Sequence, residues 1–146
     1  MKKILFAVLL SLGTLSLFAA NGPGVDEKIL ASFNKAFKNA EEVSWTEMSD
    51  SYQVSFKQNA ISSKITYDKQ GNILKTLRYY YEDQLPLMIL SKVKTKFAGK
   101  KIHGVVEMSS EAGTIYHITL EDENSWTEVK ADVYANLNVE KKFKKA

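Results

Sequence analysis

Cysteine is absent from the 146-residue chain, and there are only two histidines and two prolines. Without cysteine the chain can form no disulfide bond, and it has no cysteine to carry a lipid anchor. An exported chain of this kind must be held together by its core alone, and about 126 residues are enough for that. Gly-rich phosphate loops and Gly-x-Ser-x-Gly nucleophile motifs are missing too. Together these absences argue against most enzyme classes.

One long hydrophobic run is present, and it lies at the N-terminus. Lys2 and Lys3 precede the apolar run 4–17, and Ala19 and Ala20 follow it. A short basic stretch, an apolar stretch and small residues are typical of a secretory signal peptide, with cleavage expected near Ala19 or Ala20. The alternative is a membrane anchor, but the run is shorter than the roughly 20 residues that a spanning helix needs. We therefore expect residues 1–20 to be a signal peptide, the mature chain 21–146 to lack a membrane span, and the protein to be periplasmic or secreted.

An excess of charge of one sign is also missing once the signal peptide is set aside. The full chain has 20 Lys and Arg against 17 Asp and Glu, and without Lys2 and Lys3 the numbers are 18 and 17. A nearly neutral domain lacks the electrostatic footprint of a nucleic-acid-binding protein. We expect no nucleic-acid partner. The short signal and the lack of cysteine suggest a bacterial source.

The mature chain shows helix and strand periodicities in one order, twice. Apolar residues at helical spacing predict helices over 26–40 and after Pro86. Alternating residues predict four strands after each helix, with a Gly-containing turn at Asp68–Gly71 in the first set. The strand-like segments are 43–48, 52–57, 61–67, 73–81, 101–109, 114–121, 125–133 and 138–143. We expect an α+β fold with a tandem α-β4 repeat: one antiparallel sheet of about eight strands, both helices on one face and the other face open.

The two halves, about 25–81 and 82–146, can be aligned to each other by pattern. Near the helices the offset is about 60, which pairs Phe37 with Phe97, and near the ends an offset of 66 pairs Asn72 with Asn138. With this offset the Asp-x-x-Gly-Asn turn of the first half has no counterpart in the second. We expect a different turn around residues 134–138.

Several motifs resemble those of the secreted PepSY-like family of Bacteroidota. They are Phe33-x3-Phe37-x2-Ala40-x2-Val43-x-Trp45, Tyr52-x-Val54-x-Phe56, Tyr67-Asp68-x2-Gly71-Asn72-Ile73 and Leu85-Pro86. They cover most of the mature chain and are structural. The resemblance implies a single domain with a fold like that of the β-lactamase inhibitory protein, and inhibition of an enzyme is a possibility that rests on this analogy alone.

Few residues could support chemistry. His103 and His117 fall on predicted strands, and with Glu107 they could bind a metal, although their spacing is not that of a ligand set. Carboxylate pairs lie in predicted loops and helix ends, where solvated charge is the usual explanation. We therefore expect no enzymatic activity and no cofactor.

The informative feature is the open face of the predicted sheet. Alternation places Leu74, Arg78, Tyr80, His117, Trp126 and Lys130 on it, and aromatic residues and arginine often anchor interfaces. The first hypothesis is a non-catalytic periplasmic or secreted binding protein that uses this face for an unknown protein or peptide, with inhibition of an enzyme as one form of this role. The alternative is a metal- or small-molecule-binding sensor centred on His103 and His117. Scattered surface aromatics are the simpler explanation that any binding role must displace. The sequence does not indicate an oligomeric state.

Overall fold

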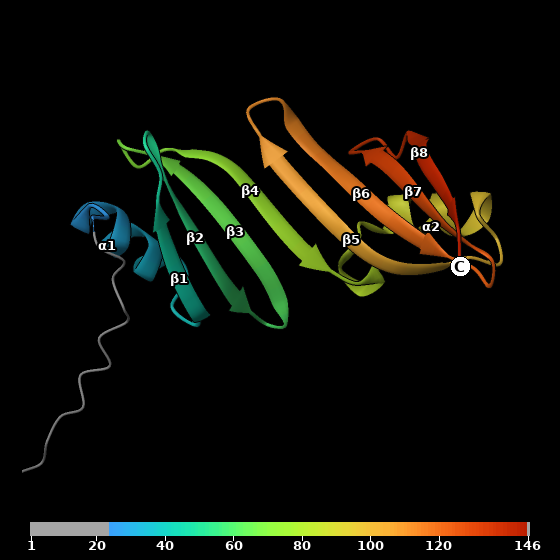
Figure 1. The fold of residues 1–146 in the computed structure, drawn as a ribbon, viewed down its shortest axis with the longest axis horizontal. Helices are drawn as coiled ribbons and strands as arrows, with labels where there is room; N and C mark the ends of the chain where they lie inside the picture. Colours follow the sequence, from blue (N-terminus) through green and yellow to red (C-terminus); the bar gives the residue numbers. More distant parts are fainter. Residues whose placement is uncertain (1–23, 146) are drawn as a thin grey trace, which may run out of the picture.

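The computed structural model describes residues 24–145, so the predicted signal peptide lies outside the described residues. Figure 1 shows a long twisted sheet with a helix near each end. The first half of the chain contains α1 (Glu27–Ala36), β1 (Glu41–Glu47), β2 (Ser51–Gln58), β3 (Ile61–Asp68) and β4 (Ile73–Tyr80). After the short 3-10 helix η1 (Glu82–Gln84), the second half contains α2 (Leu87–Lys96), β5 (Lys101–Ser110), β6 (Gly113–Glu121), β7 (Ser125–Asp132) and β8 (Leu137–Lys144).

The eight strands form one sheet, ordered β1 to β8 as in the sequence, and every neighbouring pair is antiparallel. Short turns join the strands within each half, and the longer connection from β4 to β5 contains η1 and α2. Antiparallel neighbours need no crossover between strands. The predicted α+β class, the eight strands and their antiparallel order are confirmed.

Both helices pack on the same face of the sheet, which we call the helix face. In the first half, Val54 is opposite Ile65, and Ile65 is opposite Thr76. In the second half, Tyr80 is opposite Val105, and Val105 is opposite Ile118. Thr76 and Tyr80 lie four residues apart on β4, so they point to the same side. The buried residues of both halves therefore share one face, as predicted.

The two helices begin differently but end in the same way. The carboxylate of Asp26, the N-cap of α1, accepts a hydrogen bond from the amide of Lys28 at 2.7 Å. Pro86 is the N-cap of α2, at the residue before the first helical turn. Phe37 and Phe97 are the C-caps, and each donates its amide hydrogen bond to the carbonyl four residues earlier.

A turn of one kind closes both the β3–β4 and the β7–β8 hairpins. The carboxylate of Asp68 accepts hydrogen bonds from the amide of Gln70 and from the amide and side chain of Asn72, at 2.9, 2.8 and 2.8 Å. Asp132 receives the same three bonds from Tyr134 and Asn136, at 2.9, 2.9 and 2.8 Å. The expectation of a different second turn is wrong, because the offset here is 64 and not 66.

The positive φ that such a turn requires explains why the sequence concealed the match. Gly71 adopts φ 92° in the first turn, and Ala135 adopts φ 60° at the equivalent place in the second. Glycine is the usual residue there because it has no Cβ. Ala135 is buried in the core of the second half, where its methyl group contributes to the packing.

The buried residues form two separate cores. Ile29 and Phe33 of α1 pack with Val54 and Phe56 of β2 in the first. In the second, residues of α2 pack on β5, β6 and β7, and Tyr80 of β4 belongs to this cluster. Neither α1 nor α2 covers the middle of the helix face, which lies between the two helices (Figure 1).

Candidate functional site

The candidate site lies on the sheet face opposite the helices, which we call the open face. The register of β6 and β7 places His117 and Lys130 opposite each other there, and Glu121 opposite Trp126. On β7, the core residues Thr127, Val129 and Ala131 are buried, whereas Trp126, Glu128 and Lys130 between them are half-buried. The predicted outward positions of His117, Trp126 and Lys130 are therefore correct.

An apolar patch lies at the centre of the open face. Leu77 is opposite Met108, and Met108 is opposite Ile115, so three apolar side chains form a row across β4, β5 and β6. Tyr79 and Val106 are opposite each other in the next row. These five residues, called the central patch below, are all half-buried or exposed. Open antiparallel faces are usually polar, so a contiguous apolar group on one needs an explanation.

A hollow of about 340 Å³ adjoins the central patch. It is lined by Tyr79, Tyr81, Gly104, Val106 and Thr119, together with neighbouring residues. Gly104 is opposite Thr119 on the open face, and a Cβ at that glycine would meet no other atom within 4 Å. The missing side chain thus leaves room beside two tyrosines of β4 and the loop that follows it.

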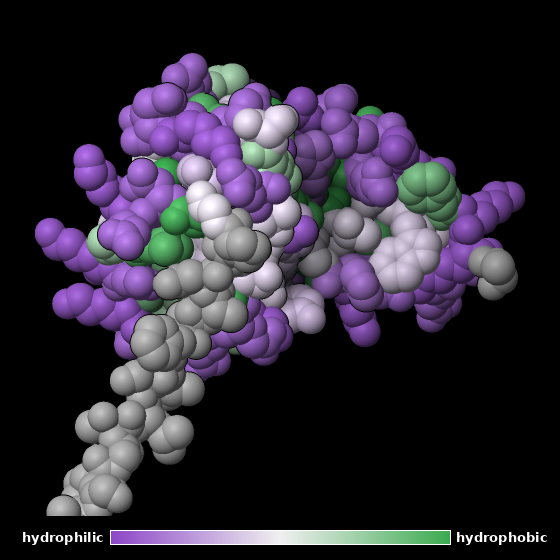
Figure 2. Space-filling model, turned by 60° about the vertical axis from the view of Figure 1, so that its left-hand side comes forward, coloured by the Kyte–Doolittle hydropathy of each residue, from purple (hydrophilic) through white to green (hydrophobic). Residues whose placement is uncertain are grey.

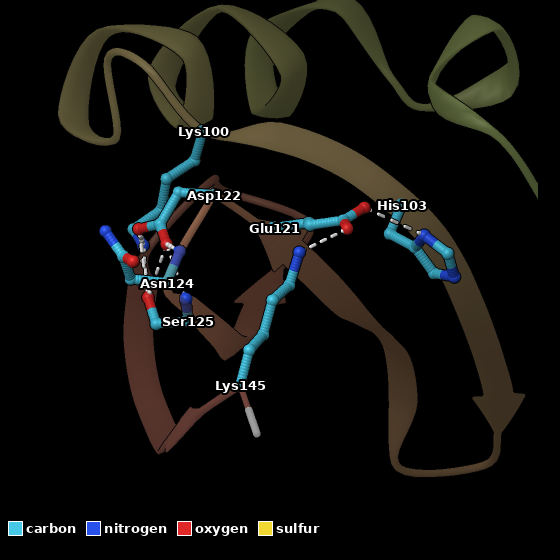
Figure 3. Close-up of polar contacts among 7 residues, drawn as sticks. All are labelled: Lys100, His103, Glu121, Asp122, Asn124, Ser125 and Lys145. Carbon is cyan, nitrogen blue, oxygen red and sulfur yellow. Dashed lines mark hydrogen bonds and ion pairs between the residues drawn. The ribbon is translucent and has the colours of Figure 1, made fainter.

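Aromatic residues cluster at the far end of the open face. Trp126 is opposite Phe143, which is 46% exposed. The ring of His103 meets that of Trp126 edge-on at 4.7 Å, and the ammonium of Lys145 lies 4.8 Å from the indole centre. Figure 3 shows Glu121 between His103 and Lys145, and hydrogen bonds from Lys145, followed by those from His103, lower the pKa of its carboxyl group.

The neighbouring β6–β7 turn has a structural role. Asp122 accepts hydrogen bonds from Lys100, from the backbone amide of Asn124 and from the backbone amide and hydroxyl of Ser125 (Figure 3). The bond from Lys100, together with these others, holds the pKa of Asp122 well below its usual range. Every oxygen of this carboxylate is used inside the turn, so the residue is a turn cap and is not available for catalysis.

The charges of the open face are unequal. Its lysines are Lys57, Lys64, Lys75, Lys101, Lys130, Lys141 and Lys145. Its glutamates are Glu41, Glu42, Glu121, Glu128 and Glu140, and all of them except Glu41 are within ion-pair distance of Lys57, Lys145, Lys141 or His117. Within residues 24–145, Lys64, Lys75, Lys101 and Lys130 have no carboxylate partner.

Arg78 and Tyr80, predicted on the open face, instead lie on the helix face at the junction of the two halves. Tyr80 is 6% exposed, and its hydroxyl donates a 2.6 Å hydrogen bond to Glu107. One nitrogen of Arg78 contacts both oxygens of Glu107 at 3.2 Å. Burial, and then the hydrogen bond to Glu107, raises the pKa of Tyr80. Because Tyr80 is a core residue, the placement of Tyr80 and Arg78 in a binding face is wrong.

Leu74, the remaining predicted site residue, occupies a β-bulge. The register passes from Thr66 opposite Lys75 to Tyr67 opposite Ile73, which leaves Leu74 without an opposite residue. Its side chain is 45% exposed, at the end of β4. The bulge adds one residue to β4, so every later residue of the strand points to the face opposite to the one that strict alternation predicts.

The two histidines do not form a metal site with Glu107. His103 pairs with Glu121, and His117 pairs with Glu140. Glu107 lies on the opposite face of the sheet, with Arg78 and Tyr80. Among residues 24–145, no group of three or more His, Cys, Asp or Glu side chains could hold a metal ion.

A second hollow, of about 260 Å³, lies on the helix face between the halves. Phe37, Phe56, Ile61 and Ile65 form much of its wall, and Arg78 lies at its border. In the view of Figure 2 the surface is mostly hydrophilic, and hydrophobic groups show as small patches and inside a central hollow. Since Arg78 is already neutralised by Glu107, this hollow offers apolar surface but no free charge.

Sequence alternation missed most of the central patch. The alternation that places Arg78 and Tyr80 on the open face turns Leu77 and Tyr79 toward the helices, and it does not distinguish Val106 from the buried Val105. Both strands contain apolar residues at odd and even positions, so alternation alone could not choose between the faces. The polar residues Arg78 and Glu107 favoured the wrong answer, because they lie on the helix face as a pair.

No protein-family model matches the chain, and no curated protein matches it either. Solved structures do. A BLIP-like protein from Bacteroides fragilis superposes with a TM-score of 0.62 at 18% identity, over 83% of this chain and 88% of that one. A DUF2874 family protein from Bacteroides uniformis superposes with a TM-score of 0.59 at 13% identity, over 82% of this chain and 88% of that one. A proposed periplasmic protein from Bacteroides eggerthii superposes with a TM-score of 0.60 at 10% identity, over 82% of this chain and 88% of that one.

Sequence identities this low relate the proteins by fold alone. The shared features are the ones described above: an eight-stranded meander and two helices on one face. The expected likeness to the β-lactamase inhibitory protein fold is confirmed, while the PepSY-like label rests on the sequence motifs. The chain therefore has the fold of BLIP-like proteins known from Bacteroides.

Proposed function

We propose that this is a non-catalytic binding protein of the periplasm or the medium, and that its open face binds a protein or peptide. The proposal includes removal of residues 1–20 and a mature single domain made of the two halves. The observation that carries it is the central patch, an apolar group on a sheet face that neither α1 nor α2 covers. Such patches on soluble proteins mark interaction sites.

The surroundings of the patch support the same function. The adjoining hollow at Gly104 could accept a partner side chain between Tyr79 and Tyr81. The half-buried Trp126 and exposed Phe143 extend the apolar surface toward β8. Interfaces combine an apolar centre with a polar rim, and aromatic residues supply much of their binding energy.

Localisation outside the cytoplasm is supported by the sequence and by one structural relative. The N-terminal run has the form of a signal peptide. The similar protein from Bacteroides eggerthii is described as a proposed periplasmic protein. No helix within the described part of the chain is long and apolar enough to cross a membrane.

The test compares two matched pairs of substitutions. Tyr79→Gln with Met108→Gln removes apolar surface from the central patch, whereas Leu87→Gln with Met88→Gln removes it from the exposed side of α2. Each tagged double variant is incubated with cell-envelope extract and culture medium of the bacterium that carries the gene. We expect a partner retained by wild type and by the α2 variant but not by the central-patch variant.

Thermal melting of both variants provides the control, because loss of binding with an unchanged melting temperature assigns the effect to the surface. A partner that the central-patch variant still retains, or one that only the α2 variant loses, would overturn the proposal. The open face could also be occupied by a second copy of this chain. Mass measurement after gel filtration tests for such a dimer. A dimer that only the central-patch variant abolishes would mean that the face serves self-association instead.

A further inference from the structure

The open face has a charge imbalance that bears on the chemistry of its partner. Four of its five glutamates lie within ion-pair distance of a lysine or a histidine, as described above. Glu41 has no such partner, but it lies on the edge strand β1, which β2 and β3 separate from the central patch. Asp132 is opposite Ile115 of the central patch, but its carboxylate accepts hydrogen bonds from the turn that follows β7. Around the central patch, the described part of this face therefore presents no carboxylate free to attract a cation.

Four lysines on this face have no carboxylate partner among residues 24–145, and three of them lie on both sides of the central patch. Lys64 of β3 is directly opposite Leu77. Lys75 lies two residues before Leu77 on β4 and points to the same side. Lys130 of β7 is opposite His117, which is opposite Val106. Positive charge thus borders the patch along β3, β4 and β7.

We propose that the partner presents an acidic polypeptide segment carrying apolar side chains, and that this segment lies across the central patch with its carboxylates near Lys64, Lys75 and Lys130. This inference rests on the proposed function. An apolar side chain of the segment would occupy the hollow beside Gly104. Complementary charge at the rim of an interface selects the partner and speeds encounter, while the apolar contacts supply most of the affinity.

The probe is a phage-displayed library of random peptides, selected on the immobilised protein. Selected peptides should be rich in Asp and Glu and should contain at least one large apolar residue. Their affinity should fall about two- to fivefold for each of Lys64→Gln, Lys75→Gln and Lys130→Gln, the usual effect of an exposed ion pair. Lys35→Gln, an exposed lysine of α1, is the matched control and should change nothing.

Two further measurements distinguish the possible reasons for failure. Raising NaCl from about 0.05 M to about 0.5 M should weaken the peptides, since salt screens exposed charges. The double variant Tyr79→Gln with Met108→Gln should lose them by about thirtyfold or more, as expected for interface anchors. Peptides that depend on the central patch but are neutral or basic would overturn the acidic partner and leave the proposed function standing. Peptides that bind independently of the central patch, or the absence of any selected peptide, would count against both.

Discussion

Thr127 is buried on β7, and its hydroxyl has no hydrogen-bond partner among the described residues. A buried polar group without a partner costs about 1–3 kcal/mol. Valine has nearly the same shape and suits a strand. We therefore expect Thr127→Val to raise the free energy of unfolding by roughly 1 kcal/mol, measured by urea denaturation. Thr114→Val is the comparison, because its hydroxyl has a partner in Ser109 at 2.8 Å and should not show the gain. A loss of stability in Thr127→Val would show that the hydroxyl is satisfied after all.

Three aspartates in turns should make the protein sensitive to acid. Hydrogen bonds from Asn72, Lys100 and Asn136 are the largest causes that lower the pKa values of Asp68, Asp122 and Asp132 below the reference of 3.8. Near pH 4 the unfolded chain thus binds more protons than the folded one, so stability falls as the pH falls. The contribution is fully present above about pH 5 and is lost as the pH drops through the lowered pKa values.

Thermal melts from about pH 7 to about pH 2.5 test this expectation. The melting temperature of wild type should be nearly constant down to about pH 5 and then decline. The melting temperature of Asp122→Asn should be lower at about pH 7 and should decline less steeply with falling pH, because this variant has one fewer aspartate with a lowered pKa. A wild-type melting temperature that does not change between about pH 5 and about pH 3 would contradict it.

At the scale of single elements, α1 is held by its middle and not by its end. Phe33 is 1% exposed, and its ring lies about 5 Å from those of Phe37, Trp45 and Phe56. Phe37 is the C-cap and only half-buried. Phe33→Ala should therefore cost about 3–5 kcal/mol, and Phe37→Ala clearly less. Chemical denaturation of both variants measures the difference. Equal costs would mean that the helix extends past Ala36 in solution.

The success of sequence reasoning also varied by element. Alternation assigned β2, β3, β6 and β7 to the correct faces, because most of their apolar residues occupy one parity, and Ile115 and Trp126 are single exceptions. It failed on β4 and β5. The bulges at Leu74 and His103 insert a residue that no periodic pattern contains. The pair of Arg78 and Glu107 also could not be foreseen, since alternation assigns charged residues to the solvent face and gives no sign that these two pair on the helix face. The helices, the eight strands and their order were predictable; the central patch was not.

At the scale of the whole molecule, the two cores are joined mainly through the pairing of β4 with β5. Tyr80 packs into the core of the second half, so β4 contributes to both halves. The other contacts at this junction include the polar pair of Arg78 and Glu107 and the packing of Ile61 of β3 against the core of the second half. Local openings follow such boundaries between cooperative units. The two halves should therefore differ in how they respond to a mutation in one core.

Native-state hydrogen exchange tests this division. Phe33→Ala should lower the protection of amides in β1, β2 and β3 more than that of amides in β6 and β7. Ile89→Ala, in the core of the second half, should produce the opposite pattern. Each variant serves as the control for the other. Uniform loss of protection in both variants would mean that the sheet unfolds as one cooperative unit.

The outer strands of the sheet also limit how the protein can polymerise. β1 contains Glu41, Glu42 and Glu47, whereas β8 contains Lys141, Lys142 and Lys144. Two β1 edges or two β8 edges would repel each other, but a β1 edge and a β8 edge of different copies would attract. Head-to-tail addition of that kind does not close and would produce a fibre. The bulges, at Glu41–Ser44 in β1 and beside Glu140 in β8, twist both edges away from a straight pairing partner. We expect bulge geometry, more than charge, to keep this protein from polymerising at low ionic strength.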